Sequence, residues 1–338
     1  MISPHLSLYP VERSFGSGAI ALLRQQLVLA LPARATGGFS MHIGDFVFHR
    51  PASVAEACDL SRELGEGAWF LAGGTDVVPD LKRRFRAARH LISLAGIAEL
   101  KGINSNSDGL EIGALTTHAA VAADGLVRST LPALSDAAGS IGGHQIRSQA
   151  TIGGNWCGGV PCADTPPVCI VGQARAVISD GKEEREIDAA EFITGPRETA
   201  LGRGDILRCI RIPSARQNSG TSFQRFTLRK GLALAVASVA VSVDLDGNRI
   251  KSARVALGAV GPTPIVAHSS IAALEGNEPD ESVLAQAAAA AAADARPITD
   301  IRGSKEYRRD IVQVLTRRAL AQALRRARGE ESNSKAGA

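Results

Sequence analysis

Gln145-Ile-Arg-Ser-Gln-Ala-Thr-Ile-Gly-Gly-Asn155 is the most informative run in this chain of 338 residues. Close to its end it contains Gly153 and Gly154, and glycine permits positive φ angles and the close approach of another group to the backbone. Successive backbone N–H groups in such a turn can bind an anion. The run lies in residues 142–167, a segment rich in glycine and proline for which we predict no regular structure. A compact domain seldom keeps so long an irregular segment unless it has a function.

A second glycine-rich turn occurs earlier in the chain, in Phe70-Leu-Ala-Gly-Gly-Thr-Asp-Val77. It follows directly on an apolar run of strand length, residues 68–72, and its N–H groups can form a similar anion site. Such a turn alone is equally consistent with the ordinary end of a strand. Two of them in one domain suit the pyrophosphate of a dinucleotide better than either does alone.

Composition excludes several classes of protein. Hydrophobic residues make up 45% and charged residues 21%, which is the balance of an ordinary globular protein. The net charge of +4 is too small to argue for a nucleic-acid partner. No apolar run reaches the length of a transmembrane helix, about 18 residues. The five cysteines are an odd number in a large chain, so we expect a reducing compartment, the cytoplasm, rather than a disulfide scaffold.

The amino-terminal region has a faint likeness to a signal peptide in residues 18–35. However, Arg24, Gln25 and Gln26 interrupt the apolar segment where a signal should be continuous. We therefore interpret residues 1–40 as a poorly ordered extension, or as the product of a start codon upstream of the natural one at Met41. The polar tail, residues 329–338, is expected to be disordered.

Periodicity and turn signals predict mixed helices and strands after Met41. Ser53 and Glu56 form a capping-box pattern at the start of a helix. Asp246-Gly247 between two apolar runs predicts a β-hairpin. A polar stretch at 214–221 is interpreted as a linker. The expected strands are 46–48, 68–72, 91–94, 110–113, 176–179, 205–213, 235–244 and 249–257; the expected helices start at 53 and 130 and cover 283–295 and 304–328.

The last of these helices has two different faces. Its apolar face carries Tyr307, Ile311, Val314, Leu315 and Leu320. We predict that the other face is solvated, with docking to an acidic partner as the alternative. That second face is basic, with Arg308, Arg309, Arg317, Arg318, Arg325 and Arg326.

The common catalytic patterns are absent from the sequence. It contains no G-x-G-x-x-G, Walker, G-x-S-x-G or H-E-x-x-H motif. The seven histidines are scattered singly, and no pair has the spacing of metal ligands. We therefore assign no catalytic residue and no metal site to this chain.

Several motifs together resemble one known family. Gly73-Gly74-Thr75-Asp76, the 145–155 run, Pro161-Cys-Ala-Asp164-x-x-Pro167 and the 300–309 segment before the last helix occur in the order and spacing of the molybdenum hydroxylase flavoproteins. These are the FAD-binding medium subunits of the xanthine dehydrogenase and carbon monoxide dehydrogenase family. The resemblance covers about residues 41–328. Each motif alone is weak, but the set is specific.

The resemblance implies an α+β fold with two domains. The first, residues 41–215, would be a PCMH-type FAD-binding domain of two subdomains, about 41–95 and 96–215, with the flavin between them. The second, residues 222–328, would be a smaller α+β C-terminal domain with a three-stranded sheet.

The resemblance also implies electron transfer as part of a larger enzyme. In the family, a large partner subunit carries molybdopterin, a small one carries two [2Fe-2S] clusters, and FAD exchanges electrons with the final donor or acceptor. This chain has no ferredoxin-type cysteine pattern and is too short for a molybdopterin domain, so partners must supply both, as in a dimer of heterotrimers. The alternatives are a stand-alone flavin oxidoreductase of the same fold and a non-catalytic interaction module.

The family's cofactor-binding positions can be carried over residue by residue. The first pyrophosphate loop corresponds to Phe70, Leu71, Ala72, Gly73, Gly74, Thr75, Asp76 and Val77, and the second to Thr151, Gly153, Gly154 and Asn155. Asp164 matches an acid that contacts the cofactor, Ile141 a residue near the flavin, and Leu207 one that packs against it. Relatives often carry lysine where this chain has Arg225, whose role stays open because arginine cannot exchange a proton.

The implied FAD would be bound non-covalently, since no histidine or cysteine lies in an evident flavin-linking motif. Cys157-x4-Cys162 falls where the 4-hydroxybenzoyl-CoA reductase branch of the family opens an inserted loop for an extra [4Fe-4S] cluster. That loop is missing here, and three cysteines do not supply the usual four thiolates. We expect Cys157, Cys162 and Cys169 to be small buried residues, with Cys157 nearest the flavin.

Overall fold

The computed structural model describes residues 43–330. Residues 1–42 and 331–338, and with them the extension and nearly all of the tail considered above, lie outside the described residues. Within residues 43–330, no helix is long and apolar enough to cross a membrane.

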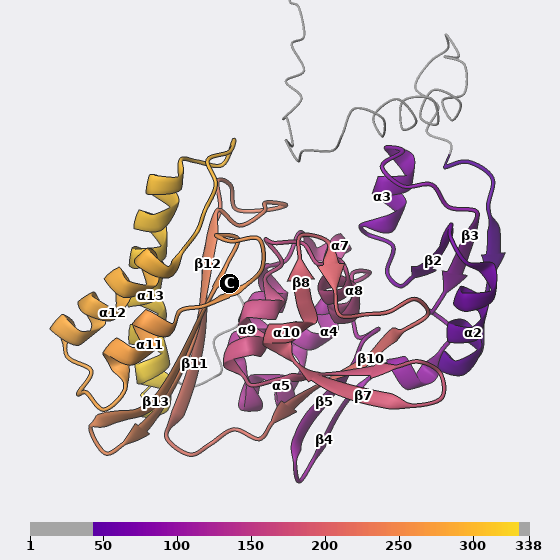
Figure 1. Cartoon of the computed structure of the whole chain (residues 1–338). Helices are drawn as coiled ribbons and strands as arrows, with labels where there is room; N and C mark the ends of the chain where they lie inside the picture. The colour runs from indigo at the N-terminus through magenta and orange to yellow at the C-terminus, as the bar shows by residue number, and fades with distance from the viewer. Residues whose placement is uncertain (1–42, 331–338) are drawn as a thin grey trace, which may run out of the picture. The chain divides into compact units, whose positions relative to one another are not determined.

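The first sheet of the described chain has three parallel strands in the order β1-β3-β2. They are β1 (Val47–His49), β2 (Ala68–Leu71) and β3 (His90–Ser93), with helices α2 (Val54–Leu64) and α3 (Val77–Lys82) beside them (Figure 1). Ser53 caps α2, as expected, because its Oγ accepts the Glu56 N–H at 3.2 Å. Since β2 ends at Leu71, the glycine turn that follows lies at the carboxyl end of a parallel strand.

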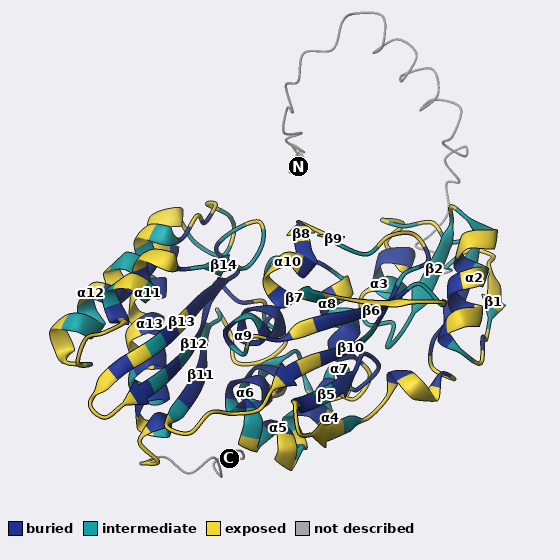
Figure 2. Ribbon diagram, turned by 60° about the horizontal axis from the view of Figure 1, so that its bottom comes forward, coloured by how far each residue is buried: buried dark blue, intermediate teal, exposed yellow. Residues whose placement is uncertain are grey.

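A second sheet is antiparallel, with five strands in the order β4-β5-β10-β6-β7. The strands are β4 (Ile103–Asn106), β5 (Gly109–Gly113), β6 (Arg175–Ser179), β7 (Glu184–Asp188) and β10 (Ile206–Pro213). One face is apolar: Ile112, Ile178 and Ile210 belong to a core shared with surrounding helices. Most residues of the central strands β5, β10 and β6 are buried (Figure 2). Those helices include α4 (His118–Ala123), α5 (Gly125–Thr130) and α6 (Pro132–Ser140); the short η1 (Ala98–Leu100), α10 (Ala189–Phe192), β8 (Ile193–Gly195) and β9 (Glu198–Thr199) complete this region.

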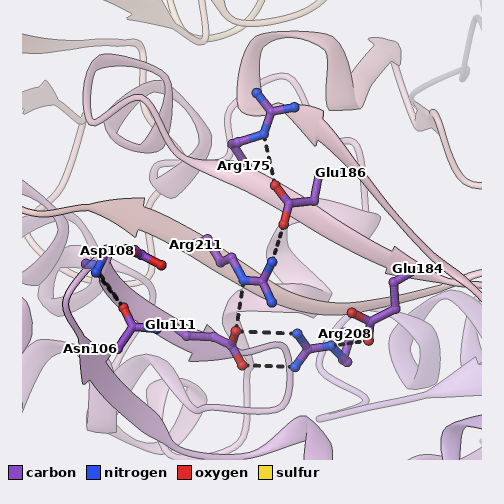
Figure 3. Close-up of polar contacts among 9 residues, drawn as sticks. Asn106, Asp108, Glu111, Arg175, Glu184, Glu186, Arg208 and Arg211 are labelled. Carbon is purple, nitrogen blue, oxygen red and sulfur yellow. Dashed lines mark hydrogen bonds and ion pairs between the residues drawn. The ribbon is translucent and has the colours of Figure 1, made fainter.

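The other face of this sheet carries a network of ion pairs (Figure 3). Glu111 accepts from Arg208 Nη1 at 2.9 Å and from Arg211 Nε at 3.0 Å. Arg211 also pairs with Glu186, and Arg208 with Glu184 at 2.5 Å. Hydrogen bonds from the two arginines lower the pKa of Glu111 to about 2. The outer face is therefore polar and internally charge-balanced, while the inner face supplies the core.

Residues 142–167 are partly helical, contrary to the expectation from their glycines and prolines that they have no regular structure. They include α7 (His144–Arg147), α8 (Ile152–Cys157) and the start of α9 (Thr165–Val171). Thr151 stabilises the start of α8, because its Oγ1 accepts the Gly154 N–H at 3.0 Å. Glycines inside so short a helix hide its periodicity. The helix expected from Thr130 begins instead at Pro132, since residues 125–130 form α5.

The C-terminal sheet is antiparallel in the order β11-β12-β13-β14. Two of its three long strands, β12 (Ala237–Asp246) and β13 (Arg249–Gly258), are those expected from residues 235–244 and 249–257. The third, β11 (Ser219–Phe226), is not among the strands expected from the sequence, and β14 (Ile265–Val266) adds a two-residue edge strand. The predicted hairpin is present at Gly247, whose φ is 57°. The expected linker is shorter than predicted, because β11 begins at Ser219.

Helices cover both faces of this C-terminal sheet. Helix α13 (Lys305–Ala327) packs on β11 and β12, and α11 (His268–Leu274) packs on β13, with α12 (Glu281–Asp294) beside them (Figure 1). On the opposite face, α6 and α9 contact β11 and β12 respectively, so Phe223 and Ala240 belong to the core of the preceding region. A central strand buried on both faces accounts for the continuous apolar run of β12.

The basic face of α13 is not uniformly solvated, which corrects the prediction. Arg308 is 1% exposed and donates to the carbonyls of Val236 at 3.1 Å and Ile298 at 2.8 Å. Arg326 pairs with Asp136 at 3.1 Å. By contrast, Tyr307, assigned to the apolar face, is 42% exposed. Backbone carbonyls near the start of the helix thus bind the Arg308 guanidinium in the interior, whereas helical periodicity alone predicts that this side chain is solvent-exposed.

Candidate functional site

A cavity of about 850 Å³ is lined by residues from the parallel first sheet, from the antiparallel second sheet, and from β11 and the chain that follows it. Its volume lies within the usual range for small-molecule and cofactor sites. Leu71, at the end of β2, is the one predicted site residue that does not line it. The nominated residues that do line it are Phe70, Ala72, Gly73, Gly74, Thr75, Asp76, Val77, Ile141, Thr151, Gly153, Gly154, Asn155, Asp164, Leu207 and Arg225.

The first glycine turn connects β2 to α3 and presents open backbone donors. Gly74 has φ 73°, a conformation that side chains other than glycine rarely adopt. A Cβ on Gly73 would lie 1.9 Å from the carbonyl oxygen of Gln149, so this position requires glycine. The N–H groups of residues 73–76 donate to no atom of the described chain. They are therefore available to an anion.

Asp76 in this turn is an acid beside a potential anion site. Burial, reinforced by nearby Asp80, raises the pKa of Asp76 above its usual value. Asp80 itself pairs with Arg86 at 2.9 Å and Arg197 at 3.1 Å. These arginines reduce the negative potential on this side of the cavity.

The second glycine turn differs from the first, although we expected two similar nests. The N–H of Gly153 donates to Ala114 O at 2.9 Å, and that of Asn155 to Thr151 O at 3.0 Å. The N–H of Gly154 is taken by Thr151 Oγ1. A Cβ on Gly153 would lie 2.6 Å from the Cβ of Ala114. This turn therefore offers close packing around the cavity rather than open N–H donors.

Asp164 and Arg225 form an ion pair in the cavity wall. Arg225 Nη1 donates to Asp164 Oδ2 at 2.5 Å, and their side chains are only 13% and 6% exposed. Burial raises the pKa of Asp164 to about 6, although Arg225 acts in the opposite direction. Asp164 Oδ1 is buried and accepts no hydrogen bond from any residue between 43 and 330. A buried oxygen in this state calls for a donor, which a molecule in the cavity can supply.

Sequence reasoning missed several residues that line the cavity. His118, the first residue of α4, is 1% exposed; burial lowers its pKa to about 4, so it is neutral near pH 7. Arg86, whose guanidinium lies 4.5 Å from the centre of the Trp69 ring, also lines the cavity. Leu232 and Leu234 belong to the β11–β12 connection. No single-sequence signal marks them, because only the packing of distant strands brings them here.

The cysteines behave only partly as expected. Cys169 is buried in helix α9, as expected of a small buried residue, whereas Cys162 is only half-buried. Cys157 is exposed rather than buried, and both it and Cys162 line the cavity. All five cysteines are free thiols. In the described part of the chain, no group of three or more side chains could hold a metal ion.

One histidine pair is close in space although the sequence spacing gives no sign of it. His49 Nε2 and His90 Nδ1 lie 3.1 Å apart on the neighbouring strands β1 and β3. With no third ligand among the described residues, the pair is interpreted as a hydrogen bond between the two rings.

The cavity's donors and acceptors fit a dinucleotide. Open N–H groups at 73–76 suit phosphate oxygens, and the unpaired Asp164 Oδ1 suits a ring N–H or a sugar hydroxyl. The model described as the FAD binding domain in molybdopterin dehydrogenase matches residues 41–215, and the CO dehydrogenase flavoprotein C-terminal domain matches residues 222–323. The chain belongs to the FAD-binding medium subunits of the molybdenum hydroxylases. It is thus an FAD-binding subunit of an oxidoreductase.

Named relatives of this medium subunit extend over most of its length. The carbon monoxide dehydrogenase medium chain of Afipia carboxidovorans is 33% identical over 84% of this chain and 99% of its own. The xanthine dehydrogenase FAD-binding subunit of Escherichia coli O157:H7 is 30% identical over 84% of this chain and 97% of its own. A chain of the carbon monoxide dehydrogenase structure from Hydrogenophaga pseudoflava superimposes with a TM-score of 0.81 at 33% identity, covering 84% of this chain and 98% of that one.

Proposed function

We propose that this medium subunit carries FAD as the electron relay of a multi-subunit molybdenum hydroxylase. It passes electrons between [2Fe-2S] clusters on a small partner subunit and an external acceptor, while a large partner with molybdopterin acts on the organic substrate. The observation that carries the proposal is the single cavity lined by both glycine turns and by the Asp164–Arg225 pair. The relatives named as medium chains support it.

The residues of the cavity divide the work of binding FAD. The N–H groups of residues 73–76 would hold the diphosphate, and the packing of Gly153 and Gly154 leaves room for it. Asp164, Ile141, Leu207 and Arg225 would hold the flavin end. Bound FAD supplies the exchange of one or two electrons, and the chain positions and shields it.

Asp164 has a defined role in this arrangement. Its Oδ2 is occupied by Arg225, so only Oδ1 is left to accept a hydrogen bond from the cofactor. With a pKa of about 6 it is largely ionised near pH 7, and an ionised carboxylate is the stronger acceptor. Arg225 keeps that charge in place and donates no proton itself.

The organisation that goes with this function has two domains. Residues 41–215 form the FAD-binding domain, with subdomains of about 41–95 and 96–215, and residues 222–328 form the C-terminal domain. The FAD is held non-covalently, and the complex is a cytoplasmic dimer of heterotrimers. The free thiols of Cys157 and Cys162 at the cavity leave non-covalent binding to be tested directly.

Co-expression of this chain with its neighbouring genes, followed by purification of the complex, tests the proposal. We expect a complex containing FAD, molybdenum and iron, from which acid precipitation releases the flavin into the supernatant. Flavin retained in the pellet would contradict non-covalent binding. A yellow chain that oxidises or reduces substrates without partners would favour the stand-alone flavin enzyme, and a colourless chain would favour the interaction module.

An Asp164→Ala complex tests the division of labour. Loss of flavin should stop transfer to the final acceptor, and added FAD should partly restore it. Substrate should still bleach the iron–sulfur absorbance, because that reduction occurs on the partner subunits. If bleaching stops while partners and metals remain, this chain does more than relay electrons.

A further inference from the structure

We propose that His118 is a ligand of the bound cofactor and donates a hydrogen bond to the diphosphate of FAD. The inference rests on the proposed function, because FAD must occupy the cavity. It adds a side-chain donor from α4 to the backbone donors of the first glycine turn.

The backbone places His118 where the two glycine turns meet. Its own N–H donates to Ala150 O at 2.9 Å, and the preceding Thr117 forms a β-bridge with Thr151. The second glycine turn therefore lies directly beside it. Ala150 is also one of the residues against which Gly73 packs: a Cβ on Gly73 would lie 3.1 Å from the Ala150 Cα. The first glycine turn thus reaches the same point.

The side chain of His118 is buried and lacks a partner. It is 1% exposed and lines the cavity. Its Nδ1 is buried and makes no hydrogen bond with any residue from 43 to 330, and no bond of Nε2 is found there either. Buried polar atoms without a partner are rare in folded proteins. Nδ1 is enclosed by the protein, whereas a group bound in the cavity would provide a partner for Nε2.

The charge state of His118 fits a donor to phosphate. Burial, with a smaller contribution from Arg147, lowers its pKa to about 4, so the ring is neutral and carries a single N–H. Phosphate ester oxygens only accept hydrogen bonds, so the ring must donate. When the proton is on Nε2, the enclosed Nδ1 is left as an unpaired acceptor, which costs less than an unpaired donor. We therefore assign the donor to Nε2.

The competing explanation is that His118 only fills space beneath α4. In that case its replacement would change the stability of the flavin-free chain and leave the affinity for FAD unchanged. If His118 binds the diphosphate, replacing it changes the affinity for FAD. The size of that change then depends on where the new side chain places its hydrogen-bond donor. The amide nitrogen of glutamine reaches the place of Nε2, whereas that of asparagine reaches only the place of Nδ1.

Titration of flavin-free full-length protein with FAD, followed by flavin fluorescence, separates the two explanations. We expect His118→Phe and His118→Asn to weaken binding by on the order of tenfold to a hundredfold, the loss of a hydrogen bond to a charged acceptor. His118→Gln should stay within about threefold of the unsubstituted chain, as one neutral donor replaces another. The matched control is His144→Phe, since His144 is also the first residue of a helix but is exposed and does not line the cavity.

Each outcome decides between the ideas. If the unsubstituted chain takes up no FAD, the proposed function and this inference fall together. If it binds FAD and the phenylalanine variant binds equally well, only the inference falls. ADP shares the diphosphate, so its binding should weaken by a similar factor in His118→Phe; unchanged ADP binding would overturn the contact with the diphosphate.

A spectroscopic measurement covers the case in which the phenylalanine variant does not fold. In protein labelled with ¹⁵N-histidine, the imidazole signal that disappears in His118→Gln belongs to His118. We expect FAD to shift that signal in the unsubstituted chain and to leave the His144 signal in place. A His118 signal that does not move on saturation with FAD would overturn the inference.

Discussion

The carboxylate of Asp164 lies 2.5 Å from the guanidinium of Arg225, and the pair joins residues 61 positions apart in the chain. Asp164 directly precedes α9, whereas Arg225 lies near the end of β11 in the C-terminal sheet. The two parts of the cavity wall are thus held together by a buried ion pair. This gives Arg225 a positioning role that requires permanent charge and no exchange of protons.

Replacing Arg225 should therefore destabilise the chain in a pH-dependent way. In Arg225→Met the pKa of Asp164 should rise further above about 6, because its opposing cation is gone. The folded variant then binds a proton that the unfolded chain releases, so its stability falls as pH rises through that window. We expect a loss on the order of 3 kcal/mol near pH 8 and a smaller one near pH 5, measured by urea unfolding of flavin-free protein.

Arg225→Lys is the control for this prediction. It keeps a cation beside Asp164 and should recover most of the stability near pH 8. If Arg225→Met loses the same free energy of unfolding at both pH values, the ion pair does not set the protonation of Asp164.

The close approach of Gly73 to the carbonyl of Gln149 predicts a sharp intolerance of any side chain. Gly73→Ala would place Cβ 1.9 Å from a backbone oxygen, so one turn must move. We expect FAD affinity to fall by on the order of tenfold or more, in line with an overpacking cost of about 1–3 kcal/mol. Gly154→Ala should be milder, because its Cβ would meet only the Thr151 Oγ1, at 3.0 Å.

Gly125→Ala is the matched control for the glycine variants. A Cβ there meets nothing within 4 Å, and the residue opens helix α5. FAD titration of the three variants should rank them Gly73, Gly154, Gly125 from weakest to strongest binding. Equal affinity in all three would show that the contact between the two turns does not matter for binding.

His118 should make the flavin-free chain sensitive to acid. Its pKa is about 4 when folded and 6.5 in the reference state, so between these values only the unfolded chain binds the proton. Stability therefore falls as pH drops through this window. His118→Gln removes this term, and relative to it the unsubstituted chain should lose on the order of 3 kcal/mol between about pH 7 and pH 4. Chemical unfolding across that range measures it; parallel curves would show that His118 is not buried neutral.

A shortened chain beginning at Met41 should bind FAD as well as the full chain. Among residues 43–330, those that line the cavity lie between Ser61 and Leu234, and the FAD-binding family match begins at residue 41. We expect dissociation constants within about twofold of each other, with equal recovery of the assembled complex. A marked loss of solubility or assembly would show that residues 20–31 pack on the body of the protein or on a partner.

Local signals made much of the fold predictable from sequence. Asp246-Gly247 fixes a hairpin because it supplies the positive φ that the turn needs, and Ser53 marks the start of a helix by capping it. The two glycine turns are likewise visible as pairs of adjacent glycines, the first directly after an apolar run of strand length, although the sequence gives no sign of helix α8 at the second. These features depend only on neighbouring residues.

Features that depend on distant contacts could not be predicted in this way. Arg308 is buried because the carbonyls of Val236 and Ile298 converge on it, and nothing in the helical pattern of α13 indicates this. In the sequence His118 is one of several isolated histidines. Only the structure shows that Ala150 lies beside it. The difference between the two glycine turns likewise depends on Ala114, whose carbonyl takes the N–H of Gly153.

The cavity's dependence on β11 has a consequence for how the protein is made. Arg225 and Leu234 complete the cavity, and the strand that carries Arg225 packs against α13, which ends at Ala327. A nascent chain still attached to the ribosome therefore has its glycine turns long before it has the rest of the binding site. A chain that stops before α13 lacks the helix that packs on this strand, so we expect it to bind no FAD and to stay colourless.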